Sequence, residues 1–237
     1  KFPLDLFQNE ACFRISKNEN VFVTAHTGCG KTVVALYAIA HTLKQGKKVI
    51  YTSPTKSLSN QKYDEFKGHF PNVGILTGDI KMNPEADCVI MTTEILLNIL
   101  YKGSENNNQT INIDSIGAVI FDEVHYINDP NRGKVWEETL VLLPSRVNLI
   151  LLSATIDKAD QMAGWLGNIK QKPIHLITTL KRVVPLKHYF WDDFESEMVE
   201  IIDENGNFHS YNEIKKKYKK RNYSTIINDF VYHLKKN

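Results

Sequence analysis

The stretch from Val21 to Thr32, VFVTAHTGCGKT, constrains the fold of this chain more than any other feature. A β-branched run ends in a glycine-containing turn, and the turn leads directly into the helical pattern VVALYAIAHTL. Strand, glycine turn and helix in this order are typical of a phosphate-binding loop, whose glycines let successive backbone N–H groups point at phosphate oxygens. The stretch therefore predicts an α/β domain with a nucleotide site at the end of a buried strand.

Two side chains at the end of this loop have the chemistry that a triphosphate requires. Lys31 would reach the β- and γ-phosphates, and Thr32 would offer a hydroxyl to Mg²⁺, which prefers oxygen ligands. The pattern departs from G-x-x-x-x-G-K-[ST] at Ala25, which stands where the first glycine is expected. The alternative is an ordinary strand, turn and helix with a solvated lysine. The predicted nucleotide contacts of the loop are Thr27, Gly28, Cys29, Gly30, Lys31 and Thr32.

Composition limits the class of protein. The chain has 237 residues, of which 42% are hydrophobic, so it can bury a substantial core. The net charge is only +2, so contacts with nucleic acid must come from local placement of groups. Three cysteines without paired spacing predict no disulfide, and no apolar run reaches the length of a membrane span. We expect a soluble intracellular protein, in the cytoplasm or the nucleus, with no membrane partner.

A second acidic signal follows the predicted strand Ile116 to Phe121. Asp122 and Glu123 come directly after this apolar run, which is where a phosphate-loop ATPase places its second magnesium contact. Asp122 is then the metal-directed group, and Glu123 would orient and deprotonate the attacking water. The alternative is that the two acids only begin a surface turn. Lys31, Asp122 and Glu123 are the predicted catalytic residues.

Hydroxyl groups end several other predicted strands. Ser53, Thr55, Lys56 and Ser57 follow a strand near residue 52, and short donors of this kind suit a sugar-phosphate backbone. Helix capping by Ser57 is an equally good interpretation. Comparable turns follow the predicted strands at 73–76, 88–91 and 149–152, the last ending in Ser153, Ala154 and Thr155.

Two single residues are less clear from spacing. The amide of Gln8 could recognise adenine through paired donor and acceptor groups, although its position alone favours a surface residue. His125 lies close after Glu123 and could bridge the nucleotide site to the strand at 149–152, although a lone histidine is usually a packing residue.

The domain organisation is predicted to change near residue 190. Residues 1–190 read as a mostly parallel sheet with helices on both faces, including a helix from Asp157 to Leu166 that Gly167 ends. Residues 191–237 read as an appendage with a hairpin turn at Asn205-Gly206, a basic run at 215–221 and an amphipathic helix. The basic run is either a solvated linker or a nucleic-acid contact.

The loop, the DEVH tetrad and the SAT tripeptide, in this order, resemble a superfamily-two DExH helicase, specifically the superkiller-like RNA helicases that work with the exosome. The resemblance extends through KVIYTSPTKSLSNQKYDEF, LTGDIKMNPEADCVIMTTEIL and VIFDEVHYINDPNRGKVWEETLVLLP. It implies the first RecA-like domain of such an enzyme, with ATP and Mg²⁺ as cofactors and 3′-to-5′ movement on single-stranded RNA.

The resemblance also implies roles for particular residues. Gln8 would recognise adenine, with Phe2 stacking on the base, and His125, Ser153, Ala154 and Thr155 would couple hydrolysis to strand movement. The implied partners are a second RecA-like domain of the same chain and RNA-decay machinery. The implied contacts with the RNA backbone are Pro54, Thr55, Lys56, Thr77, Gly78, Asp79, Thr93 and Glu94.

No glutamine-arginine or arginine-glycine-arginine motif follows the SAT tripeptide, so we expect the arginine fingers of the second domain to be missing and this chain alone to hydrolyse ATP very slowly. Two alternatives remain open. One is a DNA helicase of the related repair type, because backbone contacts do not separate RNA from DNA. The other is a non-catalytic nucleotide-binding scaffold.

Overall fold

The computed structural model describes residues 3–102, 111–180, 182, 184–192 and 197–208. Phe2, the polar loop at 104–110, the basic run and the final amphipathic helix lie outside these residues. The chain divides into two compact units, Lys1–Lys181 and Arg182–Asn237, and each is described by itself.

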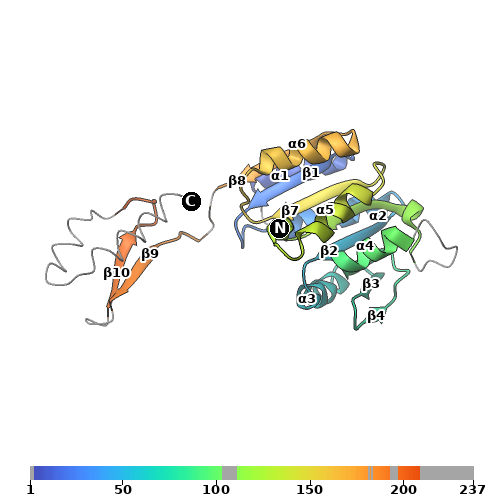
Figure 1. Ribbon diagram of the computed structural model, residues 1–237, viewed down its shortest axis with the longest axis horizontal. Coiled ribbons are helices and arrows are strands. Elements are labelled where there is room, and N and C mark those ends of the chain that lie inside the picture. Colours follow the sequence, from blue (N-terminus) through green and yellow to red (C-terminus); the bar gives the residue numbers. More distant parts are fainter. Residues whose placement is uncertain (1–2, 103–110, 181, 183, 193–196, 209–237) are drawn as a thin grey trace. The chain divides into compact units, whose positions relative to one another are not determined.

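The first unit is built on an eight-stranded sheet with the order β4-β3-β5-β2-β6-β7-β1-β8 (Figure 1). Every pairing is parallel except that of β3 with β4. The mostly parallel sheet predicted from the sequence is confirmed, with β8 at one edge. The strands are β1 (Asn20–Ala25), β2 (Lys48–Ser53), β3 (Val73–Leu76), β4 (Lys81–Met82), β5 (Cys88–Thr92), β6 (Ile116–Phe121), β7 (Asn148–Ser153) and β8 (Ile174–Thr179).

Strand β4 was not predicted. It has only two residues, both exposed, so it carries none of the apolar periodicity by which strands are recognised. It pairs antiparallel with β3 and closes the sheet at that edge.

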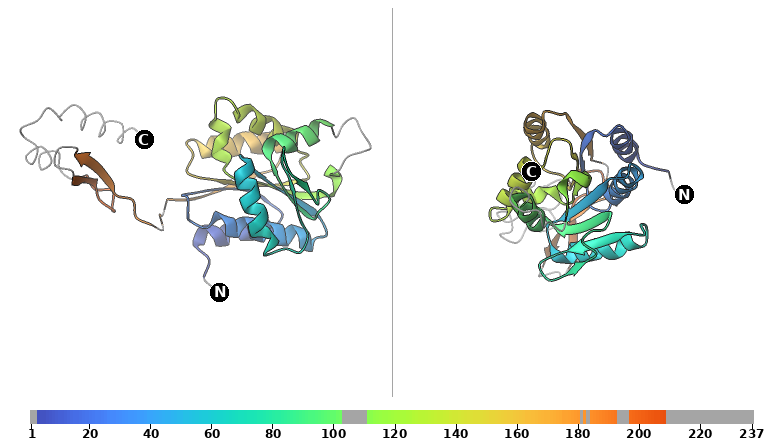
Figure 2. Two further views of the ribbon diagram at one scale, coloured as in Figure 1. Left: turned by 90° about the horizontal axis from the view of Figure 1, so that it is seen from below. Right: turned by 90° about the vertical axis from the view of Figure 1, so that its right-hand side faces the viewer.

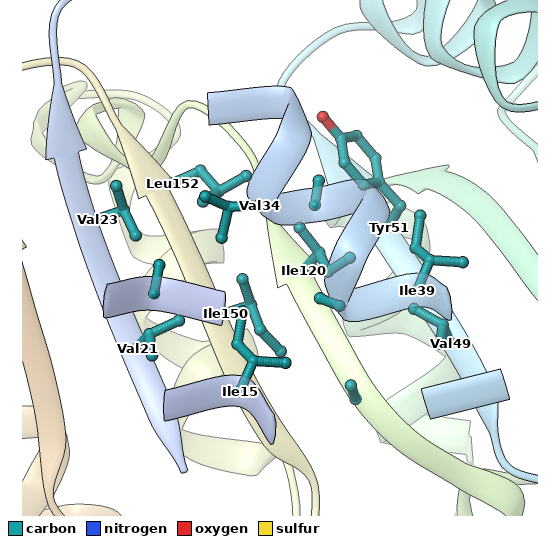
Figure 3. Packing of buried hydrophobic residues seen from close by; sticks show 14 of the residues in the cluster. Ile15, Val21, Val23, Val34, Ile39, Val49, Tyr51, Ile120, Ile150 and Leu152 are labelled. Atoms are coloured by element: carbon teal, nitrogen blue, oxygen red, sulfur yellow. The ribbon is translucent and has the colours of Figure 1, made fainter. Parts of the chain in front are cut away.

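Helices cover both faces of the sheet, as predicted (Figure 2). On one face, Ile15 of α1 and Val34 of α2 belong to the same buried cluster as Val21, Val23 and Ile150 (Figure 3), and α3 packs over β2, β3 and β5. On the other face α4, α5 and α6 pack against Phe22 and its neighbours. Alternate strand residues point to opposite faces, so a strand buried on both sides is apolar throughout. The helices are α1 (Leu6–Ser16), α2 (Lys31–Lys44), α3 (Lys56–Lys67), α4 (Thr93–Lys102), α5 (Gly133–Leu142) and α6 (Ala159–Lys170).

The end of α6 corrects one prediction. Gly167 does not stop this helix, which continues to Lys170 and ends at Gln171 with a φ of 53°. The extension places Lys170 on the last turn of the helix. Lys170 is buried, and its Nζ donates to the carbonyl oxygens of Val141 at 3.1 Å and Leu143 at 2.5 Å, at the end of α5.

The start of α3 rules out one of the two interpretations of Ser57, that of a helix cap. The residue that caps this helix is Thr55, whose Oγ1 accepts a hydrogen bond of 3.3 Å from the backbone N–H of Leu58. Ser57 lies inside the first turn and is exposed, so its predicted capping role is wrong.

In the second unit, β9 (His188–Asp192) and β10 (Glu197–Ile202) pair antiparallel. The predicted hairpin turn at Asn205-Gly206 is confirmed, because Gly206 has a φ of 82° and Ile202 bridges antiparallel to Phe208. Asp203 holds the turn by accepting hydrogen bonds from the side-chain amide of Asn207 and from the backbone N–H groups of Asn207 and Asn205. The side-chain bond from Asn207 does most to lower the pKa of the Asp203 carboxyl, and the backbone bond from Asn207 comes next.

Among the described residues, we find no helix with the length and apolar character needed to cross a bilayer.

Candidate functional site

The described residues predicted to act on nucleotide or nucleic acid gather along one edge of the sheet, apart from Gln8. Each predicted group follows the carboxyl end of a parallel strand: β3, β5, β2, β6, β7 and β1, in the order in which the strands lie in the sheet. Carboxyl ends of parallel strands meet at the same edge, which is where open α/β sheets bind ligands. The edge has two halves. The candidate nucleic-acid residues follow β3, β5 and β2, and the candidate nucleotide residues follow β6, β7 and β1.

The glycines of the loop after β1 are required by its backbone conformation. Gly28 and Gly30 have φ values of 84° and 83°, in the left-handed region, and Gly30 is the residue directly before α2. A Cβ on Gly30 would also lie 2.7 Å from Nε2 of Gln8. Ala25, at the position of the expected first glycine, is the last residue of β1 and is fully buried in the core. The strand continues through that position, so glycine is not needed there.

Lys31 folds back over this loop. Its Nζ donates to the carbonyl oxygens of Ala25 at 2.8 Å and His26 at 3.3 Å, so the ammonium group lies at the mouth of the loop. Thr32, the next residue, has its Oγ1 3.0 Å from Nζ of Lys62, a residue of α3 that the sequence analysis did not identify. The two lysines place positive charge on both sides of the start of α2.

Gln8 is not a surface residue, contrary to the interpretation from its position alone. It is only 4% exposed, and both ends of its amide are bonded. Its Oε1 accepts from the backbone N–H of Asp5 at 3.0 Å, and its Nε2 donates to the carbonyl oxygens of Gly30 at 3.1 Å and Cys29 at 3.4 Å. Gln8 therefore joins the first turn of α1 to the glycine loop, next to the predicted nucleotide position. Phe2, predicted to stack on the base, lies outside the described residues.

Asp122 follows β6 and is held by Tyr51 of β2. The phenol of Tyr51 donates to Oδ2 of Asp122, and the backbone N–H of Glu123 donates to Oδ1 at 3.0 Å. Burial, together with the charge of Asp122, raises the pKa of Tyr51 well above its usual range, so the phenol remains a donor. Tyr51 lies in the core (Figure 3), inside a strand that is buried on both faces, so nothing in the local sequence distinguishes it from a packing residue.

Glu123 is in the left-handed conformation, with a φ of 56°, before a short 3₁₀ helix at Val124–Asn128. Burial and the neighbouring Asp122 raise the pKa of its carboxyl, while the charges of His125, Lys31 and Lys62 act in the opposite direction. A carboxylate with a raised pKa near two lysines is suited to accept a proton from water.

The residues predicted to couple hydrolysis to movement are brought near one another by β6 and β7, which pair side by side. Nδ1 of His125 lies 3.4 Å from Oε2 of Glu123, but the geometry of this contact is not that of a hydrogen bond. Within the described part of the chain, the buried hydroxyl of Ser153 also has no hydrogen-bond partner. Ala154 is half-buried and Thr155 is exposed.

On the other half of the edge, two charged contacts connect the candidate nucleic-acid residues. Nζ of Lys56 lies 2.5 Å from Oδ2 of Asp79, and both side chains are mostly exposed. The side chain of Lys56 also lies beside Gly78, at 3.3 Å from where a Cβ would be. Thr77 is buried, and its Oγ1 accepts from the backbone N–H of Ile80, so this hydroxyl shapes the turn before β4.

Arg132 makes the second contact, and the sequence analysis did not assign it a role. Its guanidinium donates to the carbonyl oxygen of Pro54 and to Oε1 of Glu94, the latter through Nε at 3.0 Å and also through Nη2. It therefore ties the segment after β2 to the first turn of α4. Thr93, beside Glu94, is buried, and its hydroxyl has no hydrogen-bond partner among the described residues, so it does not cap α4.

No spacing rule would have found Tyr51, Lys62 or Arg132, because each acts through a contact between elements distant in sequence. The only signal was their position close to a recognised motif.

The donors around the glycine loop fit a nucleoside triphosphate with a divalent cation. The loop and the start of α2 offer backbone N–H groups and an ammonium group to phosphate oxygens. Thr32 and Asp122 offer hard oxygen ligands. The described residues contain no group of three or more His, Cys, Asp or Glu side chains that could hold a metal. A cation here would thus take further ligands from phosphate and water, as Mg²⁺ commonly does.

Comparisons with known proteins agree with this arrangement. Residues 5–163 match the family described as DEAD/DEAH box helicase. Human superkiller complex protein 2 is 49% identical over 213 residues, which cover 88% of this chain and 17% of that protein. The antiviral helicase SKI2 of Saccharomyces cerevisiae is 49% identical over 87% of this chain and 16% of its own length. The human exosome RNA helicase MTR4 is 47% identical over 89% of this chain and 20% of its own length.

Solved structures show the same fold. A hypothetical ATP-dependent RNA helicase from Sulfolobus tokodaii matches with a TM-score of 0.59 at 22% identity, over 76% of this chain and 54% of that chain. The DUF1998 helicase MrfA bound to DNA matches with a TM-score of 0.61 at 18% identity, over 74% of this chain and 27% of that chain. This chain spans one fifth or less of the three curated relatives named above.

Proposed function

The chain belongs to the DEAD/DEAH box helicase family, and we propose that it is the ATP-binding lobe of an ATP-dependent RNA helicase of the superkiller type. In this proposal ATP hydrolysis drives 3′-to-5′ movement on single-stranded RNA. The observation that carries the proposal is the convergence of the glycine loop, Lys31 and the Asp122–Glu123 pair at one edge of the sheet, within a chain nearly half identical to named RNA helicases.

Each residue of the nucleotide half has a defined task. The backbone N–H groups of residues 27–32 and the ammonium group of Lys31 hold the phosphates. Thr32 and Asp122 hold Mg²⁺, which supplies charge neutralisation on the phosphate oxygens when it is bound. Glu123 orients the attacking water and accepts its proton, and its raised pKa brings it closer to the pH at which such a base works best. Gln8 is the proposed adenine contact, and to pair with the base its amide would have to exchange its bonds with Asp5 and the loop carbonyls.

The nucleic-acid half binds a backbone without reading bases. Lys56 is an exposed cation that can contact a phosphate, and the threonines and backbone groups beside it add short donors. The proposed set is Pro54, Thr55, Lys56, Thr77, Gly78, Asp79, Thr93 and Glu94. In the nucleotide half, a change at Glu123 would be transmitted from the end of β6 to the end of the neighbouring strand β7 by His125, Ser153, Ala154 and Thr155.

The wider context is also part of the proposal. Residues 1–190 form the first RecA-like domain, and residues 191–237 lead to a second RecA-like domain that supplies the arginine fingers. The intact protein acts inside the cell, in the cytoplasm or the nucleus, together with RNA-decay machinery. By itself, this chain would bind ATP·Mg²⁺ weakly and hydrolyse it very slowly.

A substitution at Glu123 tests the catalytic assignment. In the intact protein, Glu123→Gln should lower RNA-stimulated ATP hydrolysis by about 10²- to 10⁴-fold, and ATP·Mg²⁺ binding should remain. Glu137→Gln is a matched control, because Glu137 is an exposed glutamate on α5. Hydrolysis at the wild-type rate in Glu123→Gln would refute the assignment and favour a non-catalytic scaffold.

The DNA alternative needs its own comparison. Stimulation of ATP hydrolysis in the intact protein should be measured with poly-A RNA and with single-stranded DNA of matched length. RNA should give the larger stimulation. Equal or greater stimulation by DNA would replace RNA with DNA in the proposal.

A further inference from the structure

Lys62 is a charged side chain inside the nucleotide half that the proposed mechanism does not use. It belongs to α3, its side chain is only 12% exposed, and its Nζ has two polar contacts. One is Oε2 of Glu65, one turn further along α3, at 2.8 Å. The other is Oγ1 of Thr32, at 3.0 Å, on the first turn of α2. The ammonium group also lies 5.9 Å from the ring centre of Phe66.

The contact with Thr32 is notable because of what this hydroxyl is proposed to do. An ammonium group is a compact point charge that donates to oxygen lone pairs, and Mg²⁺ is a cation that binds oxygen lone pairs. Both cations would therefore bind the lone pairs of the Thr32 hydroxyl oxygen. Two cations that share one small oxygen repel each other, and this repulsion is larger in a partly buried site than in water.

We propose that Lys62 is a positioning residue that occupies the Thr32 hydroxyl while the nucleotide site is empty and gives way when ATP·Mg²⁺ binds. This inference rests on the proposed function and specifies which group of the protein the cation must displace from the Thr32 hydroxyl. In the empty site, Lys62 fixes the Thr32 hydroxyl and places positive charge near Glu123. In the occupied site, the ammonium group remains paired with Glu65 and leaves Thr32 to the cation.

Glu65 makes this exchange possible. Because it lies one turn from Lys62 on the same helix, its carboxylate can hold the ammonium group through a small change in side-chain torsion angles, without movement of α3. A lysine stem has the freedom for such a change, and a buried ammonium group released without a partner would be costly.

The test compares nucleotide binding with and without magnesium. Lys62→Met removes the charge and keeps most of the apolar stem, and Lys67→Met is the matched control, because Lys67 is an exposed lysine on the same helix. Equilibrium binding of a fluorescent ATP analogue to the chain would be measured in Mg²⁺ and again in EDTA. The midpoint of thermal unfolding without nucleotide would be recorded for each variant.

If Lys62 competes with the cation, Lys62→Met should bind the analogue about three- to tenfold more tightly than wild type in Mg²⁺, the size of one lost hydrogen bond. Affinity in EDTA should not change, and the unfolding midpoint without nucleotide should fall. Lys62→Arg, which keeps the charge, should restore the wild-type magnesium dependence. Lys67→Met should match wild type in every measurement.

Two results would overturn the inference. Weaker binding of Lys62→Met in both Mg²⁺ and EDTA would show that Lys62 contacts the phosphates, and equal binding in all conditions would show that it has only a structural role. If Lys62→Met does not fold, Lys62→Gln provides the same comparison. Failure of wild type itself to bind the analogue in Mg²⁺ would instead refute the proposed function.

Discussion

The two halves of the sheet edge differ in how their side chains are held before any ligand arrives. In the nucleotide half, polar groups already have partners within the protein: Lys31 on loop carbonyls, Gln8 on the loop and α1, and Asp122 on Tyr51. In the nucleic-acid half, Lys56 and Asp79 are 54% and 69% exposed at their side chains, and they pair with each other. Buried, prearranged groups favour one small ligand, whereas exposed charges favour a screened contact with a polymer backbone.

The comparison predicts that the largest effect is a loss of ATP hydrolysis caused by a substitution in the nucleotide half. Lys31→Met removes the ammonium group from the loop mouth and should lower RNA-stimulated ATP hydrolysis of the intact protein by about 10²- to 10³-fold. RNA affinity without nucleotide should stay within about twofold. A parallel loss of RNA affinity would show that the two halves are not separate. ATPase assays and fluorescence anisotropy with labelled RNA measure both quantities.

Arg132 should have an intermediate effect, because it supports the nucleic-acid half without facing solvent fully. Arg132→Met breaks the contacts with Pro54 and Glu94 and should weaken RNA binding about five- to tenfold. ATP·Mg²⁺ binding without RNA should be unaffected. Arg146→Met is the control, since Arg146 pairs with exposed Asp114 near the opposite end of β6. Equal RNA affinities in the two variants would contradict a supporting role for Arg132.

Lys56 should have a smaller and more diagnostic effect. Lys56→Met should weaken RNA binding about threefold and reduce the slope of log affinity against log salt by about 0.7, the value for one phosphate contact on a single strand. Lys134→Met serves as the control, because Lys134 is 84% exposed and its ion pair with Glu138 lies on the surface of α5. An unchanged salt slope would mean that Lys56 does not contact phosphate.

Lys170 lies outside both halves, so it should alter stability and leave ligand binding unchanged. Burial lowers the pKa of its ammonium group to about 8, and the folded protein releases this proton more readily than the unfolded chain does. The stability of wild type should therefore rise with pH between about 8 and 10.5, relative to Lys170→Met, which has no such group. The gain should be on the order of 1–3 kcal/mol.

Urea unfolding of both proteins at pH 7, 9 and 10 measures the free energy of unfolding of wild type minus that of Lys170→Met. If this difference stays constant or falls as the pH rises, the lowered pKa is contradicted. Nucleotide and RNA affinities of Lys170→Met should equal those of wild type at pH 7.

The sequence predicted the sheet and its helices because both depend on local pattern. The glycines at 28 and 30 mark the turn, and the apolar runs at 116–121 and 149–152 mark strands buried on both faces. The sequence could not predict Gln8 as a buried residue or the extension of α6 past Gly167. Both depend on contacts made in the folded chain: Gln8 with the loop, and Lys170 with the end of α5.

The same limit applied to the site. Lys31, Asp122 and Glu123 were recognised because their chemistry is tied to a fixed position after a strand. Tyr51 and Arg132 were not recognised. Tyr51 lies within the continuous buried apolar run of β2, and Arg132, at the start of a helix, contacts two segments distant in sequence. Sequence pattern identifies the groups expected to contact the ligand. The residues that hold those groups in place are identified only from the three-dimensional structure.

The amide of Gln8 connects the conformation of the glycine loop to that of the amino-terminal helix α1. It fastens the opening turn of α1 to the carbonyls of Cys29 and Gly30, so a ligand that shifts those carbonyls must also loosen or tighten that turn. Deuterium uptake by the backbone amides at the beginning of α1 would then track occupancy from a distance, with no probe attached to the nucleotide.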